Sequence, residues 1–203
     1  MTADDVETFE RCIAVGGVAL FPSDTVYGLA TEPESREGRR RLYALKGRSQ
    51  NTPAAVMFFA LDRALETLAE LGPRTRVAMG ALLPGPLTLL LPNPTRRYPL
   101  ACGPDPERLG LRVPELSGAL EPLAGAKWAV LQSSANRSGG ADCRHIEDVD
   151  ERIRAGVDLQ LDAGELPGVP STVVDLTSYE HSGEHSVVRE GALPSAAVAA
   201  ALT

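Results

Sequence analysis

The sequence predicts an α/β domain, in which helices cover a β-sheet. Short apolar runs rich in Leu, Val and Ala are interspersed with segments of helical periodicity, which is typical of a sheet covered by helices. Glycine and proline end several of these segments, for example at Pro84-Gly85-Pro86. No internal repeat or low-complexity linker divides the 203 residues, so we expect a single domain over residues 1–203.

The elements follow in order along the chain. The first is an amphipathic helix over residues 3–15, because Val6, Phe9 and Ile13 recur on one face. The next is a buried strand over residues 18–21, which ends at a proline. The further helices are predicted at 34–45, 61–71, 75–83, 147–155 and 193–202. The further strands are predicted at 54–59, 87–91, 110–113, 128–131, 159–161, 172–176 and 186–189.

The charge balance bears on the class of ligand. Apolar residues make up 43% of the chain and charged residues 23%, as in ordinary globular domains. The net charge of −7 argues against a free-standing nucleic-acid binder, because such proteins neutralise phosphates with an excess of cations. A local basic surface stays open, since cations crowd residues 36–48. The alternative interpretation of that run is a solvated helix face.

The cysteines and the apolar runs bear on the cellular compartment. Cys12, Cys102 and Cys143 lack CxxC spacing, which argues against a disulfide framework or a zinc site and fits a reducing cytoplasm. The acidic N-terminus lacks the basic region of a signal peptide, and apolar runs such as 54–61 are too short to span a bilayer. We therefore expect a cytoplasmic protein with no membrane segment.

Polar segments follow several strands, and open α/β sheets place ligand sites where strands end. In residues 21–29 (FPSDTVYGL), Ser23, Asp24 and Thr25 can cap a following helix or hold a ligand. In residues 46–53 (KGRSQNTP), two cations flank a glycine, a pairing suited to phosphate or carboxylate. The alternative there is a basic helix end that complements the helix dipole. Taken alone, each segment favours the structural interpretation.

Later segments add shape, charge and hydrogen-bond donors. Residues 83–89 (LPGPLTL) stop a helix and start a strand, so we assign them to shape rather than chemistry. Arg112 lies in an apolar strand, where its charge is costly unless it is paired or meets an anion. The loop 133–140 (SSANRSGG) can donate to an anion from backbone and side chains, although no GxxxxGK[ST] phosphate loop occurs. A sixth segment combines residues 170–175 (PSTVVD) with Arg189.

The order and spacing of these segments are more specific than any one of them. The stretches FPSDTVYGLA, KGRSQNTP, LPGPLTLLLP, LGLRVP, SSANRSG, PSTVVD and VVREGA occur in the order found in the YrdC-like family of threonylcarbamoyl-AMP synthases. The chain resembles this family over residues 21–192. The resemblance implies a YrdC-like α/β fold, with a twisted mixed sheet, flanking helices and a large concave pocket. Because longer relatives add a C-terminal domain, it also implies the short, single-domain type.

The resemblance implies an activity as well. Enzymes of this family join L-threonine, bicarbonate and ATP into threonylcarbamoyl-AMP and pyrophosphate, and a partner complex passes the threonylcarbamoyl group to tRNA. A carbamate oxygen would attack the α-phosphate, so two anions must meet. Cations and positioned donors therefore matter more than a strong protein base. Mg²⁺ is expected on the phosphates, held mostly by ATP oxygens and water.

The family's functional residues carry over onto matching positions. The resemblance implies that threonine is bound by Thr25, Arg112, Ser134 and Ser171. It implies that ATP is bound by Lys46, Arg48, Thr52, Asn136, Arg144 and Arg189. Lys46 and Arg48 are the implied catalytic cations.

Several positions depart from the family pattern. Thr52 stands where many relatives have Asn, and it keeps a hydroxyl. Met57 stands where some relatives place a histidine near the threonine, which removes a polar contact. Glu190 follows Arg189 where proline is commoner, and this acid is expected to weaken anion binding. Residues 179–186 (YEHSGEHS) predict a longer polar hairpin, in which a glycine disfavours the helix that its two histidines would need to share a metal.

Two other functions fit parts of the sequence. One is a non-catalytic tRNA or double-stranded RNA binding module of the same fold. The net charge disfavours it, and so does the presence of the complete set of polar site residues named above, although weak tRNA contact stays open. A carbamoyl-transfer module of hydrogenase maturation shares the fold. Such proteins carry acylphosphatase and cysteine-rich zinc segments, for which this chain has neither the length nor the CxxC pairs.

Overall fold

The fold is built on one mixed sheet of nine strands, seen in a computed structural model that describes residues 1–203. The strand order across the sheet is β7-β1-β2-β6-β3-β5-β4-β8-β9. The strands are β1 Ala19–Pro22, β2 Tyr27–Thr31, β3 Ala55–Met57, β4 Leu87–Pro92, β5 Arg108–Arg112, β6 Val130–Ser134, β7 Leu159–Gln160, β8 Thr172–Asp175 and β9 Ser186–Arg189. Three neighbouring pairs are parallel, namely β1/β7, β3/β5 and β4/β8, and the others are antiparallel. The predicted α/β class and mixed sheet are confirmed.

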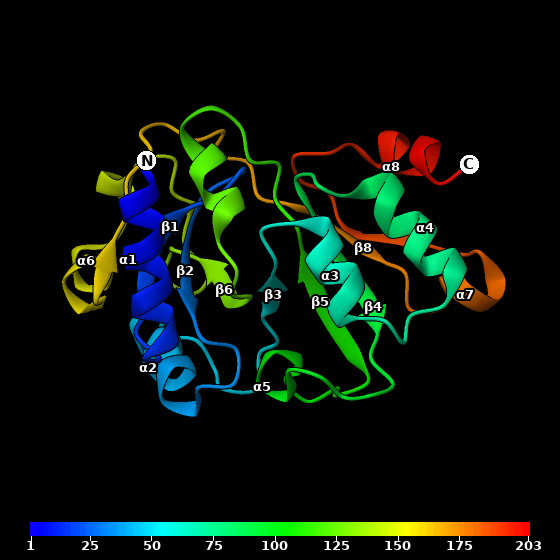
Figure 1. The fold of residues 1–203 in the computed structure, drawn as a ribbon, viewed down its shortest axis with the longest axis horizontal. Coiled ribbons are helices and arrows are strands. Elements are labelled where there is room, and N and C mark those ends of the chain that lie inside the picture. Colours follow the sequence, from blue (N-terminus) through cyan, green and yellow to red (C-terminus); the bar gives the residue numbers. More distant parts are fainter.

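Eight α-helices flank the sheet. They are α1 Ala3–Ala14, α2 Arg36–Lys46, α3 Leu61–Thr67, α4 Pro73–Leu82, α5 Pro99–Cys102, α6 Glu151–Gly156, α7 Tyr179–Ser182 and α8 Ser195–Ala201, with 3₁₀ turns η1 Gly118–Gly125 and η2 Ile146–Asp148. Figure 1 shows α1 and α2 beside the first strands, and α4, α7 and α8 beside β4 and β8. No helix of the chain combines the length and the apolar character that crossing a membrane requires.

Two apolar clusters lie on opposite faces of the first strands. Along β1, Leu20 belongs to the larger cluster of 33 buried residues, whereas Ala19 and Phe21 belong to a cluster of 13. This division follows from the two-residue period of a strand, which points successive side chains to opposite faces. Helix α1 covers the smaller cluster with Phe9, whose ring centroid lies 5.4 Å from that of Phe21.

The segment after β1 differs from one prediction. Residues 21–29 do not lead into a helix, because β1 turns directly into the antiparallel strand β2, with Phe21 opposite Gly28. Ser23, Asp24 and Thr25 therefore form a hairpin turn, and the helix-cap interpretation was wrong. Strand β2 is buried on both faces, so it lacks the alternating pattern by which a half-buried strand is recognised.

Two later boundaries also differ. The strand predicted at 128–131 is Val130–Ser134, so Ser133 and Ser134 belong to the strand and not to the loop. Residues 179–185 lie in the connection between the antiparallel strands β8 and β9, as the hairpin predicted at 179–186 requires, but Tyr179–Ser182 form the short helix α7, which ends at Gly183 in the left-handed conformation. The Glu180 carboxylate accepts hydrogen bonds from Thr75 at the start of α4, and this contact holds α7 against α4.

Candidate functional site

A cavity of about 450 Å³ opens on one face of the central strands, and its size suits a small-molecule site. Alternate residues of two strands face it, namely Thr88 and Leu90 of β4 and Arg108, Gly110 and Arg112 of β5, together with Gln132, Ser133 and Ser134 of β6. The residues between them, such as Leu89 and Leu111, are buried in the larger apolar cluster. The strand period therefore separates the core from the site.

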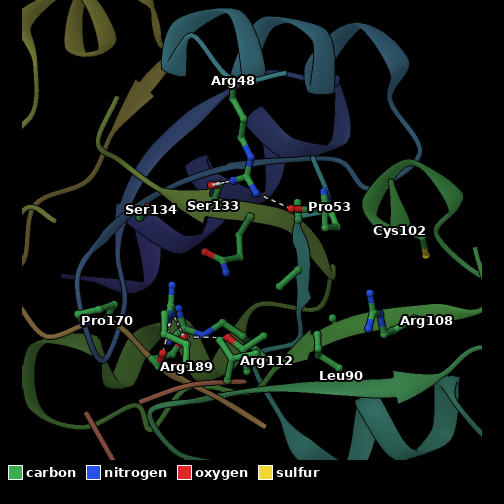
Figure 2. Close-up of a pocket in the computed structure, with 18 of the residues that line it drawn as sticks. Arg48, Pro53, Leu90, Cys102, Arg108, Arg112, Ser133, Ser134, Pro170 and Arg189 are labelled. Carbon is green, nitrogen blue, oxygen red and sulfur yellow. Dashed lines mark hydrogen bonds between the residues drawn. The ribbon is translucent and has the colours of Figure 1, made fainter. Parts of the chain in front are cut away.

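The cavity concentrates positive charge. Four arginines line it, Arg48, Arg108, Arg112 and Arg189, against two carboxylates, Asp105 and Asp142. Figure 2 shows Arg48 on one wall and Arg112 with Arg189 on the opposite wall. In a chain of net charge −7, cations gathered in a concave site attract anionic ligands.

The Arg112 guanidinium is held in place by Asp24 and Thr25 of the β1–β2 turn. Its Nη2 lies 2.6 Å from Asp24 Oδ1, and the side chains are 4% and 5% exposed. The same nitrogen donates to Thr25 Oγ1 at 3.1 Å. Burial lowers the pKa of the Arg112 guanidinium, an effect that Asp24 opposes, and burial raises the pKa of Asp24 against the opposing effect of Arg112. The buried Arg112 Nε has no protein partner, so the protein does not satisfy this guanidinium completely.

Arg48 follows the C-terminus of α2 and crosses the opposite wall. Gly47 adopts the left-handed conformation that ends the helix (φ 62°). The Arg48 guanidinium then donates to Ser133 Oγ at 2.5 Å and to Pro53 O at 2.5 Å. It also lies over the Tyr43 ring, with Cζ 5.5 Å from the centroid. Its remaining donors are oriented before any ligand arrives.

Arg189, at the end of β9, is fixed to the start of β8. Its Nη2 donates to Ser171 O at 2.6 Å, and Ser171 Oγ lies 2.8 Å from Thr88 Oγ1. Glu190 is exposed and accepts a hydrogen bond from Ser195 at the start of α8. This bond holds the Glu190 carboxylate toward α8, and its expected weakening of anion binding at Arg189 stays a prediction.

Lys46 lies behind the cavity wall and not in it. Its side chain is 3% exposed, and Nζ donates to Ser134 O, to Asn136 O at 2.7 Å and to Asn136 Oδ1 at 3.2 Å. These bonds use all three ammonium donors. Burial, with a smaller effect of Arg48, lowers the pKa of Lys46 to about 8. In this arrangement Lys46 positions the end of β6 and the loop after it, and the direct phosphate contact expected of Lys46 stays a prediction.

The loop after β6 is closed by its own side chains. Ser134 Oγ donates to Asn136 Oδ1 at 2.5 Å, and Asn136 Nδ2 donates to Gly140 O at 2.5 Å. Ser134 lines the cavity, whereas Asn136 does not. Lys46 and Asn136 therefore fix the orientation of Ser134 at the cavity edge.

Thr52, Arg144 and Met57 lie away from the cavity lining. Thr52 is half-buried, and its carbonyl accepts the Tyr43 hydroxyl at 2.8 Å. Arg144 pairs on the surface with Glu165 at 2.5 Å. Met57 is the register partner of Arg112 but is fully buried in the smaller apolar cluster. Met57 therefore belongs to the apolar core, and the expected loss of a polar contact to threonine stays a prediction.

Several lining residues escaped the sequence prediction. Thr88 lies in a segment that was assigned to shape alone, yet its hydroxyl bonds Ser171. Arg108 stands four residues before Arg112 on the same strand face, but the predicted strand began at residue 110 and excluded it. Three further lining residues belong to none of the quoted motifs, namely Asp105, Gln132 and Asp142. For Thr88, Arg108 and Gln132, which lie in strands, the available signal was a polar residue on one face of a largely apolar strand.

Comparison with known proteins defines the family of this fold and cavity. The sequence model of the Sua5/YciO/YrdC family, described as telomere recombination, matches residues 11–191. The chain belongs to this family. A threonylcarbamoyl-AMP synthase of Chromohalobacter salexigens is 30% identical over 88% of this chain and 96% of its own length. Threonylcarbamoyl-AMP synthases of Pyrococcus abyssi and Homo sapiens are each 29% identical, over 90% and 88% of this chain, which spans 52% and 64% of their lengths.

Solved structures of the Sua5/YciO/YrdC family share the fold. A variant of P. abyssi Sua5 has a TM-score of 0.82 at 26% identity and is matched over 97% of this chain and 59% of its own. P. abyssi Sua5 complexed with L-threonine has a TM-score of 0.83 at 24% identity, with 99% and 58% of the two chains covered. Escherichia coli YciO has a TM-score of 0.82 at 23% identity, with 97% and 94% covered. The predicted YrdC-like twisted sheet with flanking helices is therefore confirmed.

Proposed function

We propose that the chain is a threonylcarbamoyl-AMP synthase, an enzyme that forms threonylcarbamoyl-AMP and pyrophosphate from L-threonine, bicarbonate and ATP for tRNA modification. The observation that carries the proposal is the placement of Arg48 opposite Arg112 and Arg189 in one cavity. Relatives at 29–30% identity bear this name, and the P. abyssi Sua5 structure was determined with L-threonine.

The amino-acid half of the cavity would lie at Arg112. A carboxylate would accept from the unused donors of this buried guanidinium, which Asp24 holds in place. The linked hydroxyls of Thr88 and Ser171 and the hydroxyl of Ser134 would contact the rest of the threonine. Thr25 is fully buried beneath Arg112, so its role would be to orient that guanidinium.

The nucleotide half would lie between Arg48 and Arg189. Both guanidinium groups are tied to backbone carbonyls, Arg48 to Pro53 and Arg189 to Ser171. Fixed cations of this kind lower the cost of bringing an anionic carbamate oxygen to the α-phosphate, and they stabilise charge on the departing pyrophosphate. The reaction would thus be a nucleotidyl transfer driven by positioning and electrostatics, without a protein base.

Mg²⁺ and the partners belong to the same proposal. Mg²⁺ is commonly held by one or two carboxylates together with substrate phosphates, and Asp105 and Asp142 are the carboxylates that line the cavity. Asp105 is engaged with Arg108 at 3.5 Å, so Asp142 is the residue we assign to the ion. The bound Mg²⁺ ion would neutralise part of the negative charge of the phosphates. A threonylcarbamoyl-transfer complex would then take the intermediate to tRNA in the cytoplasm.

The decisive experiment is pyrophosphate release by the purified chain with ATP, Mg²⁺ and bicarbonate, with and without L-threonine. We expect release that depends on both threonine and bicarbonate, together with a product of the mass of threonylcarbamoyl-AMP. Absence of threonine-dependent release would overturn the proposal. Release that depends on threonine but not on bicarbonate would indicate an aminoacyl-adenylate instead, and would also overturn it.

A further inference from the structure

A second concave surface lies outside the cavity, where α2 meets α6 and the loop after β6. This groove, of about 390 Å³, is lined by four arginines, Arg40, Arg41, Arg137 and Arg152. We call it the arginine groove. The lining is completed by Ala44, Leu45 and Gly156, and no aspartate or glutamate is among the lining residues. None of these residues lines the cavity described above.

Two of the four charges already have carboxylate partners. Arg40 pairs with Glu37 at 2.6 Å, and both side chains are more than 60% exposed. Arg41 makes two bonds to Asp158, at 2.8 and 2.9 Å. Asp158 also accepts the backbone N–H of Val18 at 2.8 Å. These partners orient the two guanidinium groups while each keeps a nitrogen free, Nη1 of Arg40 and Nε of Arg41.

The other two charges are unpaired. Arg137 and Arg152 are exposed, and neither guanidinium makes an ion pair or a hydrogen bond within the protein. Arg137 lies close to the end of α2, with Nη2 3.7 Å from the position that a Cβ on Gly47 would occupy. Like charges brought together without a counter-charge destabilise a protein surface, and an anion in the arginine groove would remove that cost.

We propose that the arginine groove is a second anion site, which binds a di- or triphosphate group. Guanidinium groups match the oxygens of phosphate in paired hydrogen bonds, and four of them converge here on one small concavity. This convergence fits a compact oligophosphate better than an extended nucleic-acid backbone, whose charges are spread along a helix. The group could arrive as free pyrophosphate or as part of a nucleotide.

The position of Arg137 links this site to the loop after β6. Ser138 N donates to Lys46 O at 2.9 Å, and Arg137 directly follows Asn136, which bonds Lys46 Nζ. An anion held by Arg137 therefore touches the segment that orients Ser134. The site itself does not depend on the proposed activity, and it can be tested without turnover.

The test is a titration of the full chain with inorganic pyrophosphate, followed by NMR of the arginine Nε–H groups. Signals are assigned by the single variants Arg137→Ala and Arg152→Ala. We expect both signals to shift along a saturable curve, and the affinity at this site to fall about tenfold or more in either variant. Parallel titrations with ATP and with adenosine separate the sources. Shifts with ATP but not adenosine add a nucleotide phosphate to the ligands, and shifts with pyrophosphate alone restrict the site to the free anion.

Arg63→Ala is the matched control, since Arg63 is also exposed and forms no ion pair, and this change should leave the shifts intact. Unmoved Arg137 and Arg152 signals at about 10 mM pyrophosphate, a concentration that would detect even millimolar affinity, would overturn the proposal. Shifts no larger than those of Arg63 would also overturn it, because they would indicate general screening. Binding of a short RNA duplex through these arginines, with no response to pyrophosphate, would assign the groove to nucleic acid instead.

Discussion

Asp24 in the β1–β2 turn holds Arg112 of β5 across 2.6 Å, in a pair that is almost entirely buried. The other Asp24 oxygen accepts the backbone N–H of Glu115 at 3.1 Å. One carboxylate thus joins the turn to the strand and to the segment that follows it. Asp24 does not line the cavity, so it acts on a ligand through Arg112.

Asp24→Asn should destabilise the protein strongly. The change leaves the Arg112 charge buried without a counter-charge, and breaking a buried pair in this way costs about 3–5 kcal/mol. Urea unfolding would measure the loss. In the double variant Asp24→Asn/Arg112→Gln we expect much of that stability to return, because no unpaired charge remains. A single variant as stable as the native protein would show that the pair contributes nothing.

Arg48→Ala should abolish threonine-dependent pyrophosphate release and leave the fold intact. Arg48 is the one arginine on its wall of the cavity, and a fixed donor at a transition-state charge is worth about 10²–10³ in rate. Steady-state release and thermal unfolding would be compared in the same preparation. Arg63→Ala, on the surface of α3, is the control with unchanged rates. Native activity in the Arg48 variant would refute the assignment of this wall to the nucleotide.

The fold was predictable from the sequence where periodicity and turn residues agree. Helix α1 shows its buried face as Val6, Phe9 and Ile13, and the structure buries these three. Strand β2 was missed because both of its faces are buried, which leaves a short apolar run without alternation. Helix α7 was missed because four residues are too few for a periodic pattern.

The site was predictable as a set of motifs but not as a geometry. The sequence predicts a special role for Arg112, since a charge in an apolar strand needs a partner. Nothing local shows that the partner is Asp24, 88 residues earlier in the chain, because the pairing arises only when β1 and β5 are placed in one sheet. The burial of Lys46 could not be predicted for the same reason, because its acceptors belong to the end of β6 and the loop after it, about 90 residues away.

Tyr43→Phe should weaken nucleotide binding through the loop that carries Arg48. The Tyr43 hydroxyl donates to Thr52 O at 2.8 Å, and its ring lies under Arg48. Phe keeps the ring and loses only the hydrogen bond, at a cost of about 1 kcal/mol in unfolding free energy. We expect the KM for ATP to rise several-fold with a smaller effect on kcat. Tyr43→Leu removes the ring as well and should raise KM further; equal KM values in Phe and Leu variants would exclude a role for the ring.

Lys46 should make stability depend on pH in the alkaline range. Its pKa is lowered from 10.5 to about 8 in the folded protein, so the unfolded chain binds more protons between these values. Stability must then rise with pH across that window. The rise attributable to Lys46 is about 3 kcal/mol, from 1.36 kcal/mol per pH unit.

The measurement for Lys46 is urea unfolding from pH 7.5 to 10.5, with Lys46→Gln subtracted from the native protein at each pH. We expect the difference to grow in favour of the native protein as pH rises. Lys127→Gln is the control, since Lys127 is exposed and should give a flat difference. A flat difference for Lys46→Gln as well would mean that its ammonium is not desolvated in the folded state.

Gly191→Ala should damage the amino-acid side of the cavity without touching a side chain there. A Cβ at this position would lie 2.1 Å from Pro170 O and 2.7 Å from the carbonyl carbon of Ser171, both backbone atoms. The chain must move, and both residues line the cavity. A displacement of about 1 Å at a positioning group can cost about 10² in rate, so we expect kcat/KM for threonine to fall by one to two powers of ten.

Gly80→Ala is the contrasting control, because a Cβ there meets no atom within 4 Å. It lies inside α4 and should stabilise the protein by about 0.5–1 kcal/mol at unchanged activity. Unfolding curves and threonine kinetics are measured on both variants. A folded Gly191→Ala variant with native kcat/KM would show that the added methyl group is accommodated without displacing Ser171.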